Sequence, residues 1–165
     1  MTEISTKDLS LNPFIKIGKE WMLITAGNEQ NLNTMTASWG GVGVMWNKDV
    51  AFTFIRPSRY TYEFIQREEF FSLCFFDEKY RDALTLCGRK SGRDSDKIKE
   101  AGLTPKFIDG VPCFEEASLV LICRKMYAQE MSKDCAYTED VIKHYGTDEP
   151  YHTMYVGEIV KVLTK

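Results

Sequence analysis

Strand-length apolar segments, separated by short polar turns, recur along this chain and restrict its fold more than any other feature. They run from Trp21 to Leu163 without the regular alternation of strand and helix that a doubly wound parallel sheet requires. We therefore predict a mainly β protein with a few added helices, in which antiparallel strands form a barrel. A length of 165 residues fits a single domain spanning residues 1–165.

Glycine, proline and polar turns set the boundaries of the predicted elements. Strands are predicted over residues 21–26, 35–39, 50–55, 70–76, 118–128 and 151–163. Helices are predicted over residues 59–67, 80–86 and 98–101, and a hairpin turns at Asp109-Gly110. We expect Gly40, Gly41 and Gly43 to loosen the end of the second strand, residues 87–97 to form a polar loop, and residues 134–150 to be irregular.

Charge and hydropathy exclude several classes of partner. The 21 Lys and Arg residues are outnumbered by 24 Asp and Glu residues, so no basic excess favours binding to nucleic acid. The N-terminal segment lacks the apolar run of a signal peptide, and no apolar stretch is long enough to cross a membrane. We expect a cytoplasmic protein that binds neither nucleic acid nor a membrane.

Cysteine and histidine are too scattered to indicate a metal site. The 5 Cys residues contain no C-x-x-C pair, and the 2 His residues are His144 and His152. Reduced, mostly buried cysteines are therefore expected. No Cys–His signature, carboxylate pair or G-x-G-x-x-G motif after a strand marks a catalytic or Rossmann site. We predict no metal and no catalytic side chain.

The first candidate site is the segment Arg56-Pro57-Ser58-Arg59-Tyr60-Thr61, which joins a predicted strand to a predicted helix. The first turn of a helix offers unpaired N–H groups that bind phosphate. Ser58 is expected to cap this helix, and Arg56 and Arg59 would add charge-assisted hydrogen bonds to the phosphate. The spacing is equally compatible with an ordinary capped helix that carries exposed arginines.

The second candidate site is the strand Asn33-Thr34-Met35-Thr36-Ala37-Ser38-Trp39-Gly40, along which small polar residues alternate. Such a strand lets a flat heterocycle approach the backbone and take hydrogen bonds from N–H and C=O groups. Taken alone, an edge strand with surface threonines is the simpler interpretation.

The third candidate site is the polar loop over residues 91–97. It would fold over a ligand with Arg93 and Lys97 facing an anion, although a solvated loop is the more common role of such a charge run. The preceding Gly88-Arg89-Lys90-Ser91 lacks the Gly-Lys dipeptide of a phosphate-binding P-loop. We therefore exclude a nucleoside triphosphatase.

Taken in order, these segments resemble the flavin reductase family, whose fold is the FMN-binding split barrel. The resemblance is strongest to its flavoredoxin-like branch. The residues that carry it are 33–41, 56–65, 87–97 and the last strand, 152–159. It extends from about Lys16 to the C-terminus, which leaves residues 1–15 as an N-terminal extension.

The resemblance implies a homodimer with flavin mononucleotide (FMN) near the interface. The flavin ring would lie along Asn33, Met35, Thr36, Ala37, Ser38 and Trp39. The phosphate and ribityl chain would contact Arg56, Ser58, Arg59, Tyr60 and Thr61. The residues expected to close over the site are Ser91, Gly92, Arg93 and Lys97, with His152 near the ring.

The implied function is that of an NAD(P)H-dependent flavin oxidoreductase, in which hydride or electrons pass through bound FMN. NADH or NADPH would be the donor, and no protein acid or base is needed because the flavin carries the chemistry. Two alternatives stay open. The chain could be a non-enzymatic FMN electron carrier that serves a redox partner protein, or a binding module for another planar ligand such as haem.

Overall fold

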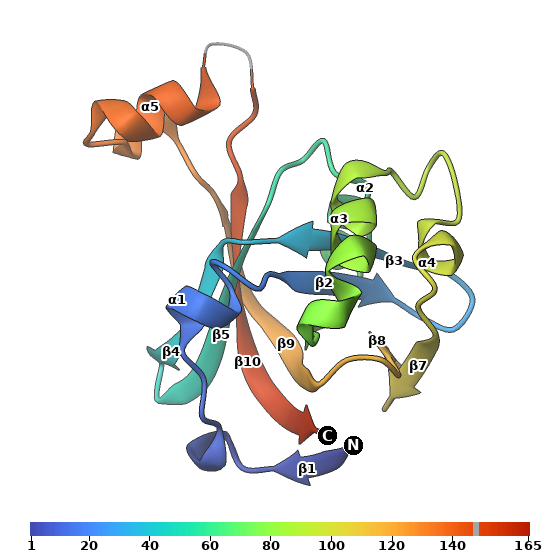
Figure 1. The fold of residues 1–165 in the computed structure, drawn as a ribbon. Helices are drawn as coiled ribbons and strands as arrows, with labels where there is room; N and C mark the ends of the chain where they lie inside the picture. Colours follow the sequence, from blue (N-terminus) through green and yellow to red (C-terminus); the bar gives the residue numbers. More distant parts are fainter. Residues whose placement is uncertain (147–148) are drawn as a thin grey trace.

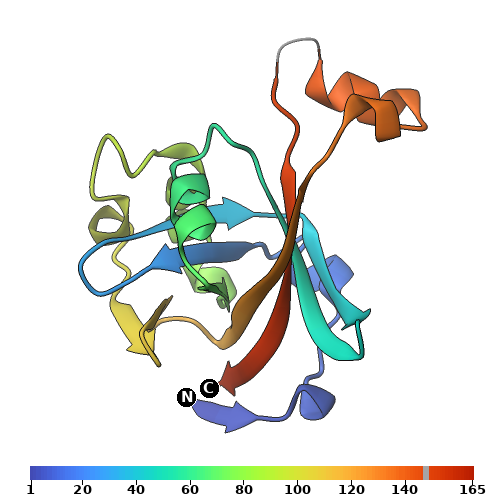
Figure 2. The ribbon, with the colours of Figure 1, turned by 180° about the vertical axis from the view of Figure 1, so that it is seen from behind.

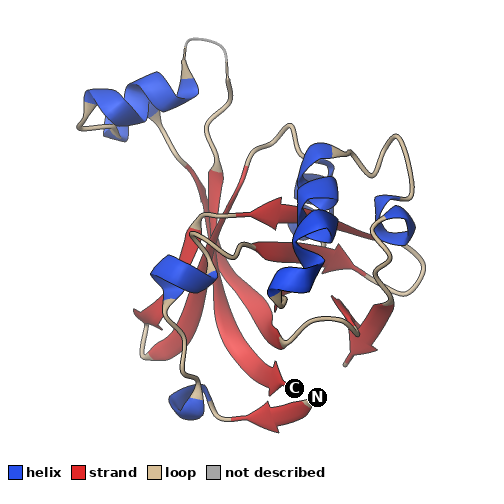
Figure 3. Ribbon diagram, viewed as in Figure 1, coloured by secondary structure: helices blue, strands red, loops and turns tan. Residues whose placement is uncertain are grey.

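The computed structural model describes residues 1–146 and 149–165, and in these residues antiparallel strands form the body of the molecule with helices around it (Figure 3). The strands are β1 (Thr2–Ile4), β2 (Met22–Gly27), β3 (Leu32–Ala37), β4 (Gly40–Met45), β5 (Lys48–Ile55), β6 (Phe70–Phe75), β7 (Pro105–Ile108), β8 (Val111–Phe114), β9 (Leu119–Glu130) and β10 (Thr153–Thr164). The helices are α1 (Pro13–Lys16), α2 (Tyr60–Arg67), α3 (Arg81–Arg89), α4 (Lys97–Glu100) and α5 (Glu139–Tyr145), with short 3-10 turns at Thr6–Asp8, Glu78–Tyr80 and Lys133–Cys135.

One strongly curved sheet runs in the order β3-β2-β6-β9-β10-β5-β4, and β1 pairs with β10 beside it. The long strand β10 holds the sheet together because it pairs with β5, β9 and β1, which brings the two termini side by side (Figures 1 and 2). Gly157 allows this strand to pack closely, since a Cβ there would lie 2.7 Å from Cζ of Phe71. The sheet thus bends around a core without closing through β3 and β4.

Two apolar cores lie on opposite faces of the sheet. Successive side chains of β2 point to opposite faces of the sheet, so Ile24 lies in one core and Leu23 in the other. Phe64 of α2 packs into the first core, which the barrel encloses, whereas Leu84 of α3 packs into the second. The two helices therefore cover different faces, and the strand pair β2–β3 lies between them.

The predicted elements between β2 and β10 are confirmed with small shifts, but three expectations were wrong. The glycines at 40, 41 and 43 do not loosen a strand: they lie in β4, which pairs with β5 from Gly40 opposite Thr53. Glycine is needed at position 40 because its φ is 153° and a Cβ there would lie 2.7 Å from the carbonyl oxygen of Phe52. Helix α3 also extends to Arg89, into the segment expected to be a polar loop.

The third wrong expectation concerns residues 134–150, which were expected to be irregular. They contain helix α5, whose first turn carries Glu139 and Asp140 and whose last turn carries Lys143 and His144. This helix projects beyond the C-terminal end of β9 and the N-terminal end of β10 (Figures 1 and 2). We call residues 131–146 and 149–152 the arm.

Candidate functional site

A cavity of about 300 Å³ lies between the end of β3, the end of β5 and the arm. Its lining residues come from five parts of the chain and are Met35, Thr36, Ala37, Ser38, Trp39, Phe54, Arg56, Arg59, His144 and His152. The strand segment 35–39 and two arginines of the segment 56–61, predicted separately as candidate sites, thus share one cavity.

The β3 wall of this cavity is fixed by hydrogen bonds on both sides. Backbone pairing with β2 sets Thr36 opposite Leu23, and the Thr36 hydroxyl donates to the carbonyl oxygen of Leu84 in α3. The Asn33 side-chain amide donates to the Thr61 hydroxyl of α2 over 2.8 Å, and both residues are buried. Asn33 and Thr61 therefore hold strand and helix together and do not line the cavity.

Two guanidinium groups form a second wall. Arg56 follows β5 directly, and Arg59 is the N-cap residue of α2. The turn between them is closed by a hydrogen bond from the Arg59 amide to the Arg56 carbonyl oxygen over 3.0 Å. Arg59 also donates from Nη1 to the carbonyl oxygen of Gly88 over 3.1 Å, which steadies its side chain at the cavity.

The prediction that Ser58 caps α2 was wrong. The helix begins one residue later, at Tyr60, and its N-cap Arg59 makes no side-chain capping bond. The reason is the turn after Pro57, which places Ser58 inside the hydrogen-bonded loop and not at the helix end. Ser58 accepts a hydrogen bond from Arg93 at its carbonyl oxygen, and the first N–H groups of α2 have no side-chain cap.

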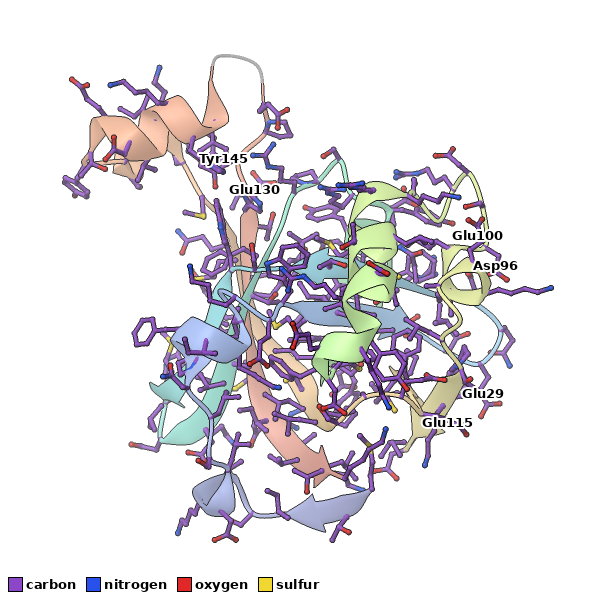
Figure 4. The ribbon with its side chains drawn as sticks, in the orientation of Figure 1. Glu29, Asp96, Glu100, Glu115, Glu130 and Tyr145 are labelled. Carbon is purple, nitrogen blue, oxygen red and sulfur yellow. The ribbon has the colours of Figure 1, made fainter. Side chains whose placement is uncertain are left out.

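Arg56 is also in contact with the arm. Its guanidinium forms an ion pair with Glu149 and lies 5.5 Å from the ring centre of Tyr145. Tyr145 is the buried residue of the arm and lies at the end of α5 beside the end of β9, where Glu130 is labelled (Figure 4). The ion pair has 21% of the Arg56 side chain and 60% of the Glu149 side chain exposed, so it is open to solvent.

Aromatic rings complete the cavity beside the arm. Trp39 contacts two imidazole rings, with centroid distances of 4.8 Å to His144 and 4.7 Å to His152. Nδ1 of His152 shares a hydrogen bond of 2.8 Å with the Tyr145 hydroxyl. Burial, followed by the positive charge of Arg56, lowers the pKa of His152 to about 4, so its ring is neutral at neutral pH.

The loop predicted to close over the site packs beside the cavity and is absent from its lining. Arg93 forms an ion pair with Glu63, lies 4.6 Å from the ring centre of Tyr60, and donates its amide to the Ser91 hydroxyl. Gly92 has no room for a side chain, because a Cβ there would lie 2.1 Å from Oδ1 of Asn33. Contact of these residues with a ligand stays a prediction.

Lys97 has a different role from the predicted one. Its side chain is 4% exposed, and Nζ donates to the carbonyl oxygens of Cys87 and Lys90, each over 3.0 Å. Burial lowers the pKa of this amine. Lys97 thus binds carbonyl groups at the C-terminal end of α3, where helices carry a partial negative charge, and it does not face the cavity.

Two lining residues, Phe54 and His144, were missed by the sequence analysis. Phe54 could have been found, because alternation along β5 places it on the same face as Arg56. His144 could not, because it reaches the cavity from a helix far along the chain.

The family model for the "Flavin reductase like domain" matches residues 16–165, which is most of the chain. The chain belongs to this family. The predicted family resemblance is thereby confirmed. No curated protein matches the chain.

Solved structures show the same fold at low identity. A flavoredoxin from Methanosarcina acetivorans matches with a TM-score of 0.70 and 22% identity over 88% of this chain and 68% of its own. An FMN-binding protein from Thermus thermophilus, solved with bound p-hydroxybenzaldehyde, matches with a TM-score of 0.71 and 18% identity. The match covers 100% of this chain and 82% of the Thermus chain. A protein from Shewanella frigidimarina with a split barrel domain, assigned as a flavin reductase, matches with a TM-score of 0.70 and 19% identity. The match covers 96% of this chain and 76% of the Shewanella chain.

These matches confirm the predicted split barrel, in agreement with the open sheet described above. Family membership ties the chain to flavin redox chemistry at a coarse level. Among the described residues, no helix is both long and apolar enough to cross a membrane.

Proposed function

We propose that this chain binds FMN in the cavity between β3 and the β5–α2 junction and passes hydride or electrons through it, with NADH or NADPH as donor. The observation that carries the proposal is that residues 35–39 and the arginines 56 and 59 line one cavity. An elongated ligand with a flat head and a phosphorylated tail matches this arrangement. The names of similar structures, which include flavoredoxin and an FMN-binding protein, support the choice of FMN.

The phosphate end fits the arginine wall. Arg56 and Arg59 line the cavity and supply charge-assisted donors, and the first turn of α2, which has no side-chain cap, begins directly after Arg59. Arg59 is already oriented by its hydrogen bond to Gly88, so little side-chain freedom is lost when it binds an anion. These residues would hold the tail of FMN.

The head fits the β3 wall. Thr36 and Ser38 line the cavity, with the Thr36 hydroxyl held by the carbonyl oxygen of Leu84, and Trp39 offers an aromatic surface that is 39% exposed. His152 adds a neutral imidazole whose Nδ1 is held by Tyr145. Bound FMN would supply the group that accepts hydride or electrons. The protein side chains would then orient the head, exclude water from one side of it and donate hydrogen bonds to its polar edge.

A purified sample tests this proposal directly. We expect an absorbance band near 450 nm from bound flavin, and we expect NADH or NADPH to bleach it without oxygen. A flavin band that neither nicotinamide bleaches would favour an electron carrier that serves a partner protein. A haem spectrum in place of a flavin band would overturn the proposal. The homodimer and the cytoplasmic location belong to the same proposal, and the mass of the FMN-loaded particle in solution tests the dimer.

Replacement of one arginine tests the phosphate end of the site. Arg59→Ala should weaken FMN binding by about 1.5–3 kcal/mol, because a charge-assisted hydrogen bond to the phosphate is lost. The matched control is Arg67→Ala, which removes a guanidinium from the other end of the same helix, and its FMN affinity should equal that of the parent protein. Equal FMN affinity in Arg59→Ala would remove Arg59 from the phosphate site.

A further inference from the structure

Tyr145 is buried at the end of a helix that is otherwise mostly exposed (Figure 4). Its ring stacks on Tyr151, with the ring centres 3.8 Å apart and the planes 15° apart, and it meets the ring of His144 nearly at a right angle. The Arg56 guanidinium lies near the same ring. These contacts leave the Tyr145 side chain little freedom, so the position of its hydroxyl group is fixed.

The Tyr145 hydroxyl has one proton and two acceptors within reach. Nδ1 of His152 lies 2.8 Å from the hydroxyl oxygen, and the thioether sulfur of Met131 lies 3.8 Å from it. A thioether sulfur is a weak acceptor, whereas an imidazole nitrogen without a proton is a strong one. The proton therefore goes to the shorter contact, in which Tyr145 donates and Nδ1 accepts.

This hydrogen bond determines which nitrogen of His152 carries the ring proton. The pKa of His152, lowered by burial to about 4, leaves a neutral ring with a single proton at neutral pH. Because Nδ1 accepts, that proton is on Nε2. His152 lines the cavity beside Trp39, and among the described residues the hydrogen-bond partner of its ring is Tyr145, at Nδ1. The Nε2–H group is thus left for a ligand.

We propose that Tyr145 is a positioning residue for the flavin site, which holds the proton of His152 on Nε2 and so makes this imidazole a hydrogen-bond donor to the flavin ring. The inference rests on the proposed function, because the acceptor is the polar edge of the FMN head. That edge consists mostly of nitrogen and carbonyl oxygen acceptors, and the other tautomer of His152 would present a lone pair to them. Through this one hydroxyl the arm sets how His152 meets the flavin.

The tautomer can be measured without any flavin. The chain has 2 His residues, so the nitrogen-15 NMR spectrum of histidine-labelled protein contains two imidazoles, and His144→Gln assigns them. In the parent protein we expect His152 with its proton on Nε2 alone. Tyr145→Phe removes only the hydroxyl, and the Nδ1 resonance should move towards that of a protonated nitrogen as the second tautomer becomes populated.

Tyr151→Phe is the matched control. It removes the hydroxyl of the stacked ring, which has no hydrogen-bond partner among the described residues, and it should leave the His152 resonances as in the parent protein. A proton on Nδ1 in the parent protein would overturn the inference. So would an Nδ1 resonance that stays in place in Tyr145→Phe.

Titration with FMN and riboflavin tests the contact to the flavin ring. Tyr145→Phe should weaken the binding of both ligands about twofold to fivefold, because they share the ring. A loss confined to FMN would place the effect at the phosphate, through Arg56, and would overturn the inference. If the parent protein binds neither flavin but shows the expected tautomer, the proposed function falls and the flavin is not the acceptor, while the effect of Tyr145 on His152 stands.

Discussion

The two sides of the cavity differ in how they are held. The β3 wall is a buried strand that pairs with β2 and is tied to α2 and α3 by the side chains of Asn33 and Thr36. The arm on the other side is almost entirely exposed, with Tyr145 as its buried residue. Its contacts to the cavity are the ion pair of Glu149 with Arg56, the Tyr145 ring beside Arg56, and the rings around Trp39.

This difference assigns the two sides different tasks. A wall fixed by sheet register keeps its shape whether or not a ligand is present, so it is preorganised for binding. A solvent-exposed ion pair contributes little stability, and the arm can exchange it for another partner at small cost. We infer that the β3 wall determines which ligand fits and that the arm adjusts how tightly it is held.

The largest expected effect comes from breaking the support of the β3 wall. Phe64→Ala removes a ring that is 0% exposed in the core beneath β3 and should lower the free energy of unfolding by about 3–5 kcal/mol. The matched change in the arm is Tyr137→Ala, a ring that is 98% exposed, and it should change stability by less than about 0.5 kcal/mol. Urea unfolding of both variants measures the contrast.

Similar losses of stability in the two variants would contradict the distinction between wall and arm. Such a result would mean that Tyr137 is covered in solution, for example by a second copy of the chain. Repeating the unfolding over a range of protein concentrations separates these cases, because only a covered interface makes stability depend on concentration.

The same contrast explains which parts could be predicted from sequence. The strands β2, β3 and β5 and the helix α2 follow local patterns, since short apolar runs, alternating small polar residues and the stop at Pro57 are visible in a few residues. The main walls of the cavity come from two such segments, residues 35–39 and 56–61, which were each predicted as a candidate site. The arm helix α5 was missed because most of its side chains are exposed, so no apolar period marks it.

Errors in the candidate site came from contacts between neighbouring segments, which the pattern of one segment does not reveal. Lys97 was expected to face an anion because its segment is polar. In the structure, α3 extends to Arg89, and carbonyl oxygens at its C-terminal end accept hydrogen bonds from the Lys97 amine. The segment with Gly40 was expected to be loose, but its pairing with β5 requires a glycine there. Neither partner is adjacent in sequence, so local patterns carried no sign of it.

The next largest effect is a dependence of stability on pH where arm and wall meet. His152 has a pKa near 4 in the folded protein against an ordinary value of 6.5, so between these values the unfolded chain binds a proton that the folded chain does not. Stability should therefore fall as pH drops from 6.5 towards 4, by on the order of 1–2 kcal/mol once partial exposure is allowed for. His152→Gln should lose this part of the pH dependence.

Urea unfolding at pH 7 and pH 5 measures this effect as a difference between the parent protein and the variant, which cancels the titration of the carboxylates that both share. A parallel fall in both proteins would show that the His152 ring gains its proton as readily in the folded state as in the unfolded one. That result would also place His152 in water and not between Trp39 and Tyr145.

The smallest expected effect is the most specific to the arm. Glu149 occupies the Arg56 guanidinium that we assign to the phosphate of FMN, so the carboxylate and the phosphate compete for one cation. Glu149→Gln removes the competing charge and should raise FMN affinity about two- to fivefold, as expected from an exposed ion pair. Glu139→Gln is the matched control, because it removes another arm carboxylate, one that pairs with Lys143.

Riboflavin decides whether the gain arises at the phosphate. It has the same ring system without the phosphate, so Glu149→Gln should leave its affinity unchanged if the competition is at Arg56. Equal gains for FMN and riboflavin would show instead that the arm obstructs the ring side of the cavity. A gain for FMN that shrinks as salt is added would support direct charge competition, since exposed pairs are screened within about 10 Å at 0.1 M ionic strength. The arm would then act as a built-in competitor for the phosphate at the arginine wall of the cavity.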